Sequence, residues 1–415
     1  MSGSINLDRE RIRELFDLRR RGDGSYAVYT DDPYPMLHRL RETGPLHEGT
    51  VHKLIGAEGP MTFHGLPQPD REHFSVFSFA VCDEVYRDDS RFQSSPPDVE
   101  RGGVGIASSM LGMDGDEHRR YRTLVQPSFV PNKAKWWIEN WIHQTVHGLI
   151  DGFEAERRAE LNVDFDAAIP VLTITGSFGL SVDQALDVRA SLQGAEAVSR
   201  LTDYLVPVIA ARRAEPQDDL ISVLCEAELK AEDGTTQRLS DEEILSFSHL
   251  LLAAGSGTTW KQMGITLTAL LTTPGALDAI REDRSKLRGA VEESLRWCPT
   301  DPMFSRWVVG DTTLAGVAVP GGAVIHISIG AANRDPARWE RPDEFDMARP
   351  LRASFGFGGG SHICLGMHLA RAEMLTGISA LIDRLPNLRL DPNAPAPEII
   401  GMYERGPTEI NVVWD

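Results

Sequence analysis

Cysteine is scarce in this sequence, and its apolar runs are short. The cysteines are Cys82, Cys225, Cys298 and Cys364, and no two of them lie close enough to form a CxxC pair. This spacing argues against a disulfide-stapled secreted scaffold and against a zinc ribbon. The longest apolar stretch, around Ile244–Ala254, is interrupted by serine and histidine. It is shorter than the roughly 18 residues that a membrane helix needs, so no membrane association is expected.

A targeting segment and a positive net charge are also lacking. The N-terminus is polar and charged, without the apolar centre of a signal peptide, so a cytoplasmic location is expected. The formal charge of −19 at pH 7 makes nonspecific nucleic-acid binding a poor expectation, although a local basic patch is compatible with it. With 41% hydrophobic and 25% charged residues, the chain has the composition of a globular protein, which excludes disorder and collagen.

The clearest structural signal is a long helix in the middle of the chain. Ser240-Asp-Glu-Glu243 forms a capping box, and no proline follows until Pro274. This predicts a helix of about 30 residues, near 45 Å long, that crosses the protein. Its centre, Ala253–Gly257, is rich in small residues. Because each glycine costs a helix roughly 1 kcal/mol, we expect a bend there, or a close approach of the backbone to a ligand.

The remaining pattern predicts a mainly α fold with a minor β portion. Further helices are expected over 117–125, 287–296 and 365–385, because proline follows the last two. Alternation predicts a strand over 74–80, and residues 409–414 resemble a closing strand. Two β-branched runs flank Pro320-Gly321-Gly322, which predicts a hairpin over 314–329. Length alone, at about 150 residues per domain, suggests two or three domains.

A glycine-rich loop, Phe355–Gly366, carries the strongest chemical signal. Its glycines permit positive φ and close approach of the backbone to a flat or large group. A phosphate cradle is disfavoured, because no GK[ST] follows and Ser361 breaks the GxGxxG pattern. Cys364 precedes a helix, where N–H groups and the positive helix end favour a thiolate. A single axial thiolate on haem iron fits this setting best, the alternative being an inert buried cysteine.

Several motifs together resemble those of the cytochrome P450 monooxygenases. Phe357-x-x-Gly360-x-His362-x-Cys364-x-Gly366 is similar to their haem loop, and Glu293-Ser-Leu-Arg296 is similar to their ExxR helix. The other matching segments follow the family's order over about residues 118–366; they are Ala254–Thr259, His118–Arg122, Ala332–Pro336, Pro342–Arg349 and Arg212–Leu220. The resemblance implies a P450 fold, as one domain over 1–415, with haem between the long central helix and the cysteine-bearing loop.

The resemblance also implies roles for individual residues around haem b. Cys364 would be the proximal iron ligand, within a loop that includes Phe357, Gly358 and Gly366. The two anionic propionates need cations or strong donors when buried. The residues at the matching positions are His118, Arg122, Arg306 and His362. A structural lock on the proximal side is implied for Glu293 and Arg296, with Arg349 as the most plausible third member.

One position departs from the family on the distal side of haem. The resemblance implies that Ala254 and Thr258 border the iron, but the acid that usually precedes the threonine is replaced by Gly257. That acid normally feeds the protons that convert one oxygen atom to water. The alternative proton sources are water beside Gly257, a polar group of the substrate, and Ser256. One hypothesis is that Gly257→Asp raises the product formed per NAD(P)H consumed.

Substrate and partner expectations follow from the family's layout. The substrate would lie between 104–111, the region 167–216, the central helix and two loops, with Met303, Phe304, Met402 and Tyr403 as candidate contacts. The methionines are equally compatible with core packing. The mainly apolar lining predicts a hydrophobic small molecule. Electrons would come from a separate ferredoxin and its reductase, with Arg119, Arg120 and Arg371 as a local basic docking patch.

The leading functional hypothesis is therefore a haem-thiolate monooxygenase that inserts one atom of O₂ into an organic substrate. Gly257 motivates an alternative within enzymes, namely a peroxide-driven peroxygenase or a haem enzyme that catalyses rearrangement without O₂. A second alternative is a haem protein that binds ligands without turnover. Thr258 argues against it, because a sensor needs no distal alcohol.

Overall fold

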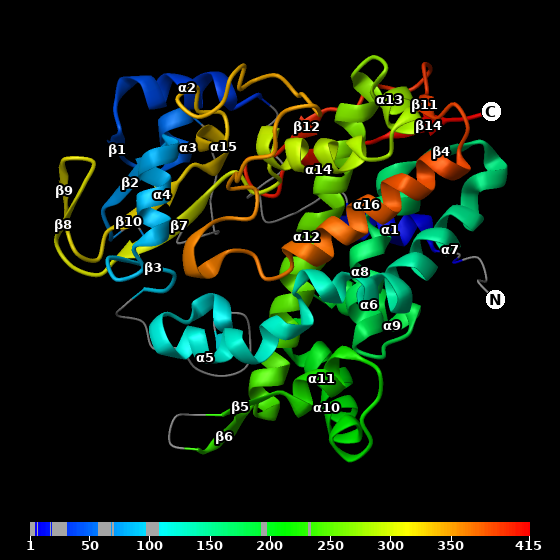
Figure 1. Cartoon of the computed structure of the whole chain (residues 1–415), viewed down its shortest axis with the longest axis horizontal. Helices are drawn as coiled ribbons and strands as arrows, with labels where there is room; N and C mark the ends of the chain where they lie inside the picture. Colours follow the sequence, from blue (N-terminus) through cyan, green and yellow to red (C-terminus); the bar gives the residue numbers. More distant parts are fainter. Residues whose placement is uncertain are drawn as a thin grey trace.

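The computed structural model describes residues 5, 7–16, 18, 31–56, 68, 70–96, 108–191, 197–230 and 234–415, with only the backbone for 191, 197 and 198. In Figure 1 the largest sheet lies on one side of the molecule and most helices on the other, with α12 running between them. The helices are α1 Arg9–Phe16, α2 Tyr34–Thr43, α3 Val51–Ile55, α4 Phe79–Arg87, α5 Gly115–Val125, α6 Ala134–Trp137, α7 His143–Phe153, α8 Ala168–Ser177, α9 Val182–Ser191, α10 Ala197–Ala214, α11 Leu220–Glu226, α12 Asp241–Thr272, α13 Ala276–Glu282, α14 Lys286–Trp297, α15 Ile329–Ala332 and α16 Met367–Arg384.

The strands are short and form one larger sheet and several small ones. They are β1 Leu46–Glu48, β2 His73–Val76, β3 Phe92–Gln93, β4 Arg158–Glu160, β5 Glu228–Lys230, β6 Thr236–Arg238, β7 Phe304–Val308, β8 Thr312–Leu314, β9 Val317–Val319, β10 Val324–Ile327, β11 Arg389–Leu390, β12 Ile399–Ile400, β13 Gly406–Pro407 and β14 Asn411–Val413. The larger sheet has the order β1-β2-β10-β7-β3, with β2 and β10 parallel and the other pairs antiparallel. This confirms the mainly α architecture with a minor β portion.

The central helix α12 begins where the capping box predicts. Ser240 Oγ accepts from Glu243 N at 3.1 Å, and Glu243 Oε2 accepts from Ser240 N at 2.7 Å. The helix continues for 32 residues through its glycines. A Cβ at Gly255 would lie 2.2 Å from Ile174 Cδ1 on α8, the helix that packs along α12. Gly255 therefore serves close packing of two helices, a reason for a small residue that the sequence did not indicate.

Two of the strand predictions need correction. The strand expected over 74–80 ends at Val76, because Ser78 caps the helix α4 through a hydrogen bond from Val81 N. The hairpin expected across Pro320–Gly322 is wrong. The hairpin lies one turn earlier, between β8 and β9, where Ala315 and Gly316 both take positive φ as a two-residue turn requires. The next strand, β10, is not part of that hairpin and pairs with β2 and β7 in the larger sheet.

The other predicted elements are present with small shifts of their ends. The helices expected over 117–125, 287–296 and 365–385 correspond to α5, α14 and α16. The closing strand is β14, which pairs with β11 and β4. The strands β12 and β13 form a separate pair that contacts α12. Within the described ranges no single helix is long and apolar enough to span a membrane, although two sharply bent helix pairs reach that length and composition.

A buried histidine in the sheet makes stability depend on pH. His326 Nε2 lies 2.9 Å from His73 Nδ1, and His326 Nδ1 lies 3.0 Å from Ser305 Oγ. Burial lowers the pKa of His326 to about 3, so the folded chain keeps this ring neutral while the unfolded chain protonates near pH 6.5. The contribution of neutral His326 is therefore complete above pH 6.5 and is lost as the pH falls toward 3.

We expect acidification from pH 7 to pH 5 to lower the free energy of unfolding by about 2 kcal/mol through His326 alone. Urea unfolding of the wild type and of His326→Asn at several pH values measures this. The variant should be less stable at pH 7 but show a shallower decline with acid. Gln144→Asn is the control, because Gln144 is exposed and has no titratable group, so its replacement should leave the slope unchanged. Equal slopes for the wild type and His326→Asn would contradict the assignment.

Candidate functional site

The loop before α16 presents Cys364 into the interior of the protein. Cys364 N donates to Phe357 O at 2.9 Å, which closes the loop, and Gly366 N–H donates to the sulfur. Burial raises the pKa of the Cys364 thiol, while the Gly366 N–H, Arg122 and Arg371 act in the opposite direction. The surroundings alone therefore do not ionise the thiol, contrary to the expectation from the sequence. A bound metal cation reverses this balance, because a coordinating thiol is deprotonated outright.

The glycines of this loop serve packing against neighbouring elements. Gly360 has φ +67°, and a Cβ there would lie 1.8 Å from Tyr86 O on α4. A Cβ at Gly356 would lie 2.8 Å from Leu295 O on α14. At Gly366, by contrast, a Cβ would meet nothing within 4 Å. Most of the glycine signal thus reflects contact of the loop with the protein itself, and only Gly366 opens onto space.

Four basic side chains from separate elements gather around the same loop. The rings of His118 on α5 and His362 stack with centroids 4.0 Å apart, and Arg122 Nη1 donates to Ser361 O at 3.2 Å. Burial lowers the pKa of His362, and the nearby Arg306 on β7 lowers it further. Burial, with the nearby His362 and Arg122, lowers the pKa of His118 to about 4.

These basic groups are poorly matched by anions within the protein. In the described part of the chain, neither Arg122 nor Arg306 forms an ion pair, and burial lowers the pKa of both guanidinium groups. His118 Nε2 is buried without a hydrogen-bond partner there. His362 Nε2 has one carboxylate neighbour, Asp114 Oδ1, at 3.5 Å. The cluster therefore has unused donors and positive charge.

One face of the central helix is accessible although the helix lies deep in the molecule. Ala254 is exposed and Thr258 partly exposed, while most of their neighbours on α12 are buried. Thr258 Oγ1 donates to Ala254 O at 2.8 Å, which leaves its lone pairs free to accept. Ser256 is engaged elsewhere, because it donates to Leu252 O and accepts from the buried Arg189. Ser256 is thus an unfavourable proton source for this face.

The structure brings together the three residues of the proximal lock. Glu293 accepts from Arg296 at 2.7 and 2.8 Å and from Arg349 at 3.0 and 3.2 Å. Arg296 also donates to three backbone carbonyls, those of Asn333, Pro342 and Glu344. The charged atoms are nearly inaccessible, with Arg296 2% and Glu293 4% exposed. The network fastens α14 to the irregular segment that leads into the cysteine loop.

The candidate substrate contacts are distributed differently from the expectation. Met303 and Met402 are 1% and 2% exposed and belong to one apolar cluster that includes Tyr403. Since almost none of their surface is accessible, the structure favours core packing over ligand contact for both methionines. Phe304 keeps partial exposure and remains a candidate. Within 104–111, residues 104–107 lie outside the described residues, and Leu111 is exposed.

The three arginines of the suggested basic patch each have an acidic partner. Arg119 pairs with Asp116, Arg120 Nη1 lies 2.6 Å from Glu243 Oε1, and Arg371 Nε lies 2.5 Å from Glu292 Oε1. Their positive charge is therefore largely balanced locally. This weakens the patch as a source of long-range attraction for an acidic partner.

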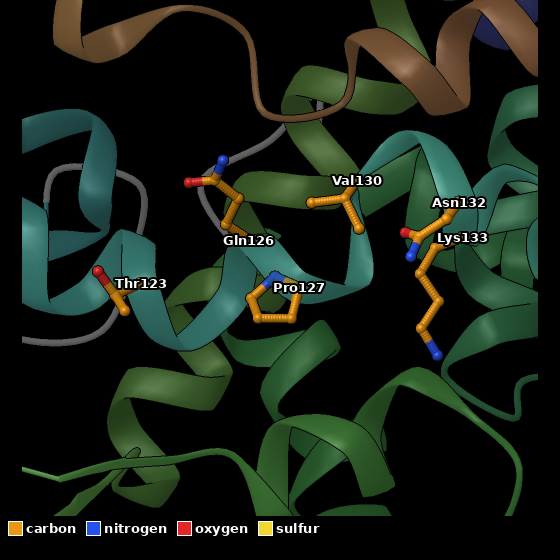
Figure 2. A pocket seen from close by; sticks show the side chains of 6 residues that line it. All are labelled: Thr123, Gln126, Pro127, Val130, Asn132 and Lys133. Atoms are coloured by element: carbon orange, nitrogen blue, oxygen red, sulfur yellow. The ribbon is translucent and has the colours of Figure 1, made fainter.

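A surface hollow of about 540 Å³ lies apart from these groups. It follows the connection from the end of α5 to the start of α6, and Figure 2 shows its side chains along that connection. They are Thr123, Gln126, Pro127, Val130, Asn132 and Lys133. The lining has no carboxylate, imidazole or thiol, so Lys133 and Thr123 have no general base beside them to activate either as a nucleophile.

Sequence reasoning missed two residues beside Gly257 of α12, Glu404 and Lys261. A Cβ at Gly257 would lie 3.6 Å from Glu404 Oε1, and Lys261 Nζ pairs with Glu404 Oε2. A signal for Lys261 was present, since it is the one Lys, Arg, Asp or Glu between 244 and 272 and therefore needs a buried partner. Nothing local in the sequence points to Glu404, which lies 143 residues further along the chain.

Comparison with known proteins identifies the family. The cytochrome P450 family model matches residues 190–395. Cytochrome P450 monooxygenase PikC of Streptomyces venezuelae is 30% identical over 376 residues, which are 88% of this chain and 86% of the relative. The mycinamicin IV hydroxylase/epoxidase of Micromonospora griseorubida is 34% identical over 334 residues, 77% of this chain and 81% of the relative. The chain belongs to the cytochrome P450 family.

The solved structures agree with this assignment. The P450 PksS of the bacillaene polyketide synthase from Bacillus subtilis superposes with a TM-score of 0.80 at 28% identity. That match covers 92% of this chain and 97% of PksS. The chain is therefore a bacterial-type P450, an oxidoreductase that incorporates oxygen from O₂, and the cofactor of its family is haem b.

The donor set of this P450 fits haem b. The two propionates would be anionic partners for the Arg122 and Arg306 guanidinium groups, which form no ion pair among the described residues. They would also offer a hydrogen-bond acceptor to the unpartnered His118 Nε2. The Cys364 sulfur is enclosed yet partly accessible, as an axial ligand must be. Ala254 on α12 is exposed, so this face of the helix would have room for the side of the haem away from Cys364.

Proposed function

We propose that this P450 is a single-domain monooxygenase that inserts one oxygen atom of O₂ into a hydrophobic small organic molecule. Bound haem supplies an iron centre at which O₂ is reduced and the substrate is oxidised. The observation that carries the proposal is the basic cluster around the Cys364 loop, in which Arg122 lies close enough to act on the Cys364 thiol and His118 stacks on His362; the accessible face of α12 adds to it.

The chain's own residues would divide the work as follows. Cys364 would hold the iron through its sulfur, and Phe357, Gly358 and Gly366 would shape the loop that presents it. His118, Arg122, Arg306 and His362 would bind the propionates and fix the plane of the cofactor. Glu293, Arg296 and Arg349 would keep the loop in place from the proximal side.

On the opposite side, α12 would shape the reaction space. Ala254 would leave room for O₂ and substrate, and the Thr258 hydroxyl would accept or pass a proton at Oγ1. Phe304 is the retained candidate for an apolar contact with substrate.

We infer that electrons come from a ferredoxin and its reductase, as separate proteins. Because Arg119, Arg120 and Arg371 are already paired with carboxylates, we expect shape and short-range contacts to contribute more to docking than a basic patch. Reversing the charge at Arg119 and Arg120 should therefore change the ferredoxin KM only slightly, about threefold or less. A much larger change would restore the patch hypothesis.

The proposed function is tested by a substrate screen followed by turnover. Haem-loaded protein is titrated with hydrophobic compounds. Polyketides are included because the relative PksS is named a polyketide biosynthesis P450. Binders are identified by the spin-state shift of the haem spectrum. Binders are then incubated with ¹⁸O₂, NADH, ferredoxin and reductase. One ¹⁸O atom in the product supports the proposal. Product formed only with H₂O₂ would replace it with the peroxygenase, and unlabelled rearranged product would replace it with the O₂-independent enzyme.

A further inference from the structure

A carboxylate stands beside Gly257, where the family's acid is missing from the helix. A Cβ built on Gly257 would lie 3.6 Å from Glu404 Oε1, 3.9 Å from Oε2 and 4.0 Å from the carboxyl carbon. Glu404 therefore brings its acid group to the part of α12 that the side chain of residue 257 would otherwise occupy. The acid comes from the connection between β12 and β13, at the C-terminal end of the chain.

The backbone on both sides of Glu404 is tied to one neighbouring segment. Glu404 N donates to Asp301 Oδ1 at 3.0 Å, and Arg405 N donates to Thr300 O at 2.6 Å. Thr300 Oγ1 returns a bond to Arg405 O at 2.8 Å. Thr300 N in turn donates to Gln262 Oε1 on α12 at 2.9 Å. The loop thus has a fixed position relative to the central helix.

The conformation of Glu404 itself is unusual. Its φ is +45°, in the left-handed region that non-glycine residues seldom adopt because the Cβ crowds the backbone. Such conformations persist only where the surrounding contacts enforce them, and they gather at functional sites. Here the hydrogen bonds to Asp301 and Thr300 supply that enforcement.

Lys261 holds the carboxylate against the helix. It lies four residues beyond Gly257 and therefore on the same face of α12. Its side chain is 0% exposed and pairs with Glu404 Oε2, while the side chain of Glu404 is 17% exposed. A buried ammonium requires a negative partner, so the pair fixes the position of Glu404, whose side chain stays partly exposed.

We propose that Glu404 is the proton-relay carboxylate of this P450, in place of the acid absent at Gly257, and that Lys261 positions it. This inference rests on the proposed function. Each turnover follows RH + O₂ + 2 e⁻ + 2 H⁺ → ROH + H₂O, with both electrons from reduced ferredoxin. Glu404 takes a proton from water that reaches its partly exposed side chain and releases it toward the Thr258 hydroxyl, one residue beyond Gly257. Release of the proton returns Glu404 to its carboxylate form, so the relay itself adds no proton to and removes none from the overall balance.

The relay changes the expectation for Gly257→Asp. With Glu404 present, the new carboxylate would start from a Cβ that lies 3.6 Å from Glu404 Oε1, and two neighbouring carboxylates disfavour each other's ionised form. We therefore expect Gly257→Asp alone to leave the coupling of NADH oxidation to product unchanged or lower. In a Glu404→Gln background the same substitution restores an acid and should restore coupling.

The turnover test uses the haem-loaded enzyme with ferredoxin, reductase and the strongest binder from the screen. Glu404→Gln should lower product per NADH about tenfold or more, with peroxide released instead, and leave KM and the spin-state midpoint unchanged. Glu404→Asp should be intermediate, and Gly257→Asp/Glu404→Gln should recover to within about threefold of the wild type. Glu398→Gln, an exposed glutamate near the same strand pair, is the control that keeps full coupling.

Two results would overturn the relay. If Glu404→Gln keeps its coupling, no proton passes through residue 404. If Gly257→Asp/Glu404→Gln gives no recovery, Glu404 is a substrate contact or a structural clasp held by Lys261, and a raised KM in Glu404→Gln would mark it as the substrate contact.

A second readout needs no turnover. Infrared difference spectra of the substrate-free protein between pH steps, in H₂O and D₂O, should show a protonated carboxyl band that disappears in Glu404→Gln and remains in Glu398→Gln. The absence of any band that depends on Glu404 would overturn the proposal. If the wild type makes no product from O₂, the proposed function fails, and this band still decides whether Glu404 exchanges protons.

Discussion

Glu293→Ala is expected to destabilise the protein by about 3–5 kcal/mol, because it leaves the buried Arg296 and Arg349 guanidinium groups without their anion. The remaining bonds from Arg296 to backbone carbonyls do not neutralise its charge. Since the network fastens the segment that leads to the cysteine loop, the variant should also lose haem. Urea unfolding and the haem content of the purified protein measure the two effects.

Glu344→Ala is the matched control for this prediction. Glu344 lies in the same irregular segment, but its side chain pairs with Arg341, and both side chains are more than half exposed. Its carbonyl, which accepts from Arg296, survives the substitution. The control should change stability by less than about 1 kcal/mol. Similar losses in the two variants would show that the buried network has no special role.

Cys364→Ser should abolish oxygen insertion. Serine keeps the size of the side chain and the backbone bond to Phe357 O, but it replaces the soft sulfur with a poorly coordinating hydroxyl. With any binder from the screen, turnover should fall on the order of 100-fold or more. Product formation driven by ferredoxin, normalised to haem content, is the measurement.

The control for this variant is Cys225→Ser. Cys225 is a buried cysteine on α11, away from the loop, so its replacement should affect stability more than chemistry. It should retain turnover per haem. If Cys364→Ser also retained turnover, Cys364 would not be the iron ligand.

Local signals explain how much of the fold could be predicted from the sequence. The capping box at Ser240 and the absence of proline up to Pro274 suffice for α12, because both act within a few residues. The hairpin prediction failed because the turn signal at Pro320–Gly322 competes with Ala315-Gly316. The latter matches the two-residue loop that β8 and β9 need.

The site shows the same division between local and long-range information. The spacing around Cys364 indicated the haem loop, and the motif positions of His118, Arg122, Arg306 and His362 indicated residues that the structure brings together. The glycines were explained by packing on Tyr86, Leu295 and Ile174, which no local pattern reveals.

The largest gap concerned the missing acid. From the sequence, Gly257 suggested an interrupted proton supply and motivated a peroxide-driven alternative. The structure places the Glu404 carboxylate beside Gly257, a contact between residues 147 positions apart that depends on the path of the C-terminal strands. That proximity supports the O₂-dependent function over the alternatives. The lone charge of Lys261 was the one sequence signal that an acid lay near.

The carbon monoxide difference spectrum of the reduced, haem-loaded protein tests the haem-thiolate assignment most directly. The wild type and Cys225→Ser should both show the red-shifted band of thiolate-ligated haem, and Cys364→Ser should lack it while binding some haem. The same band in Cys364→Ser, or its absence from the correctly folded wild type, would contradict ligation of the iron by Cys364.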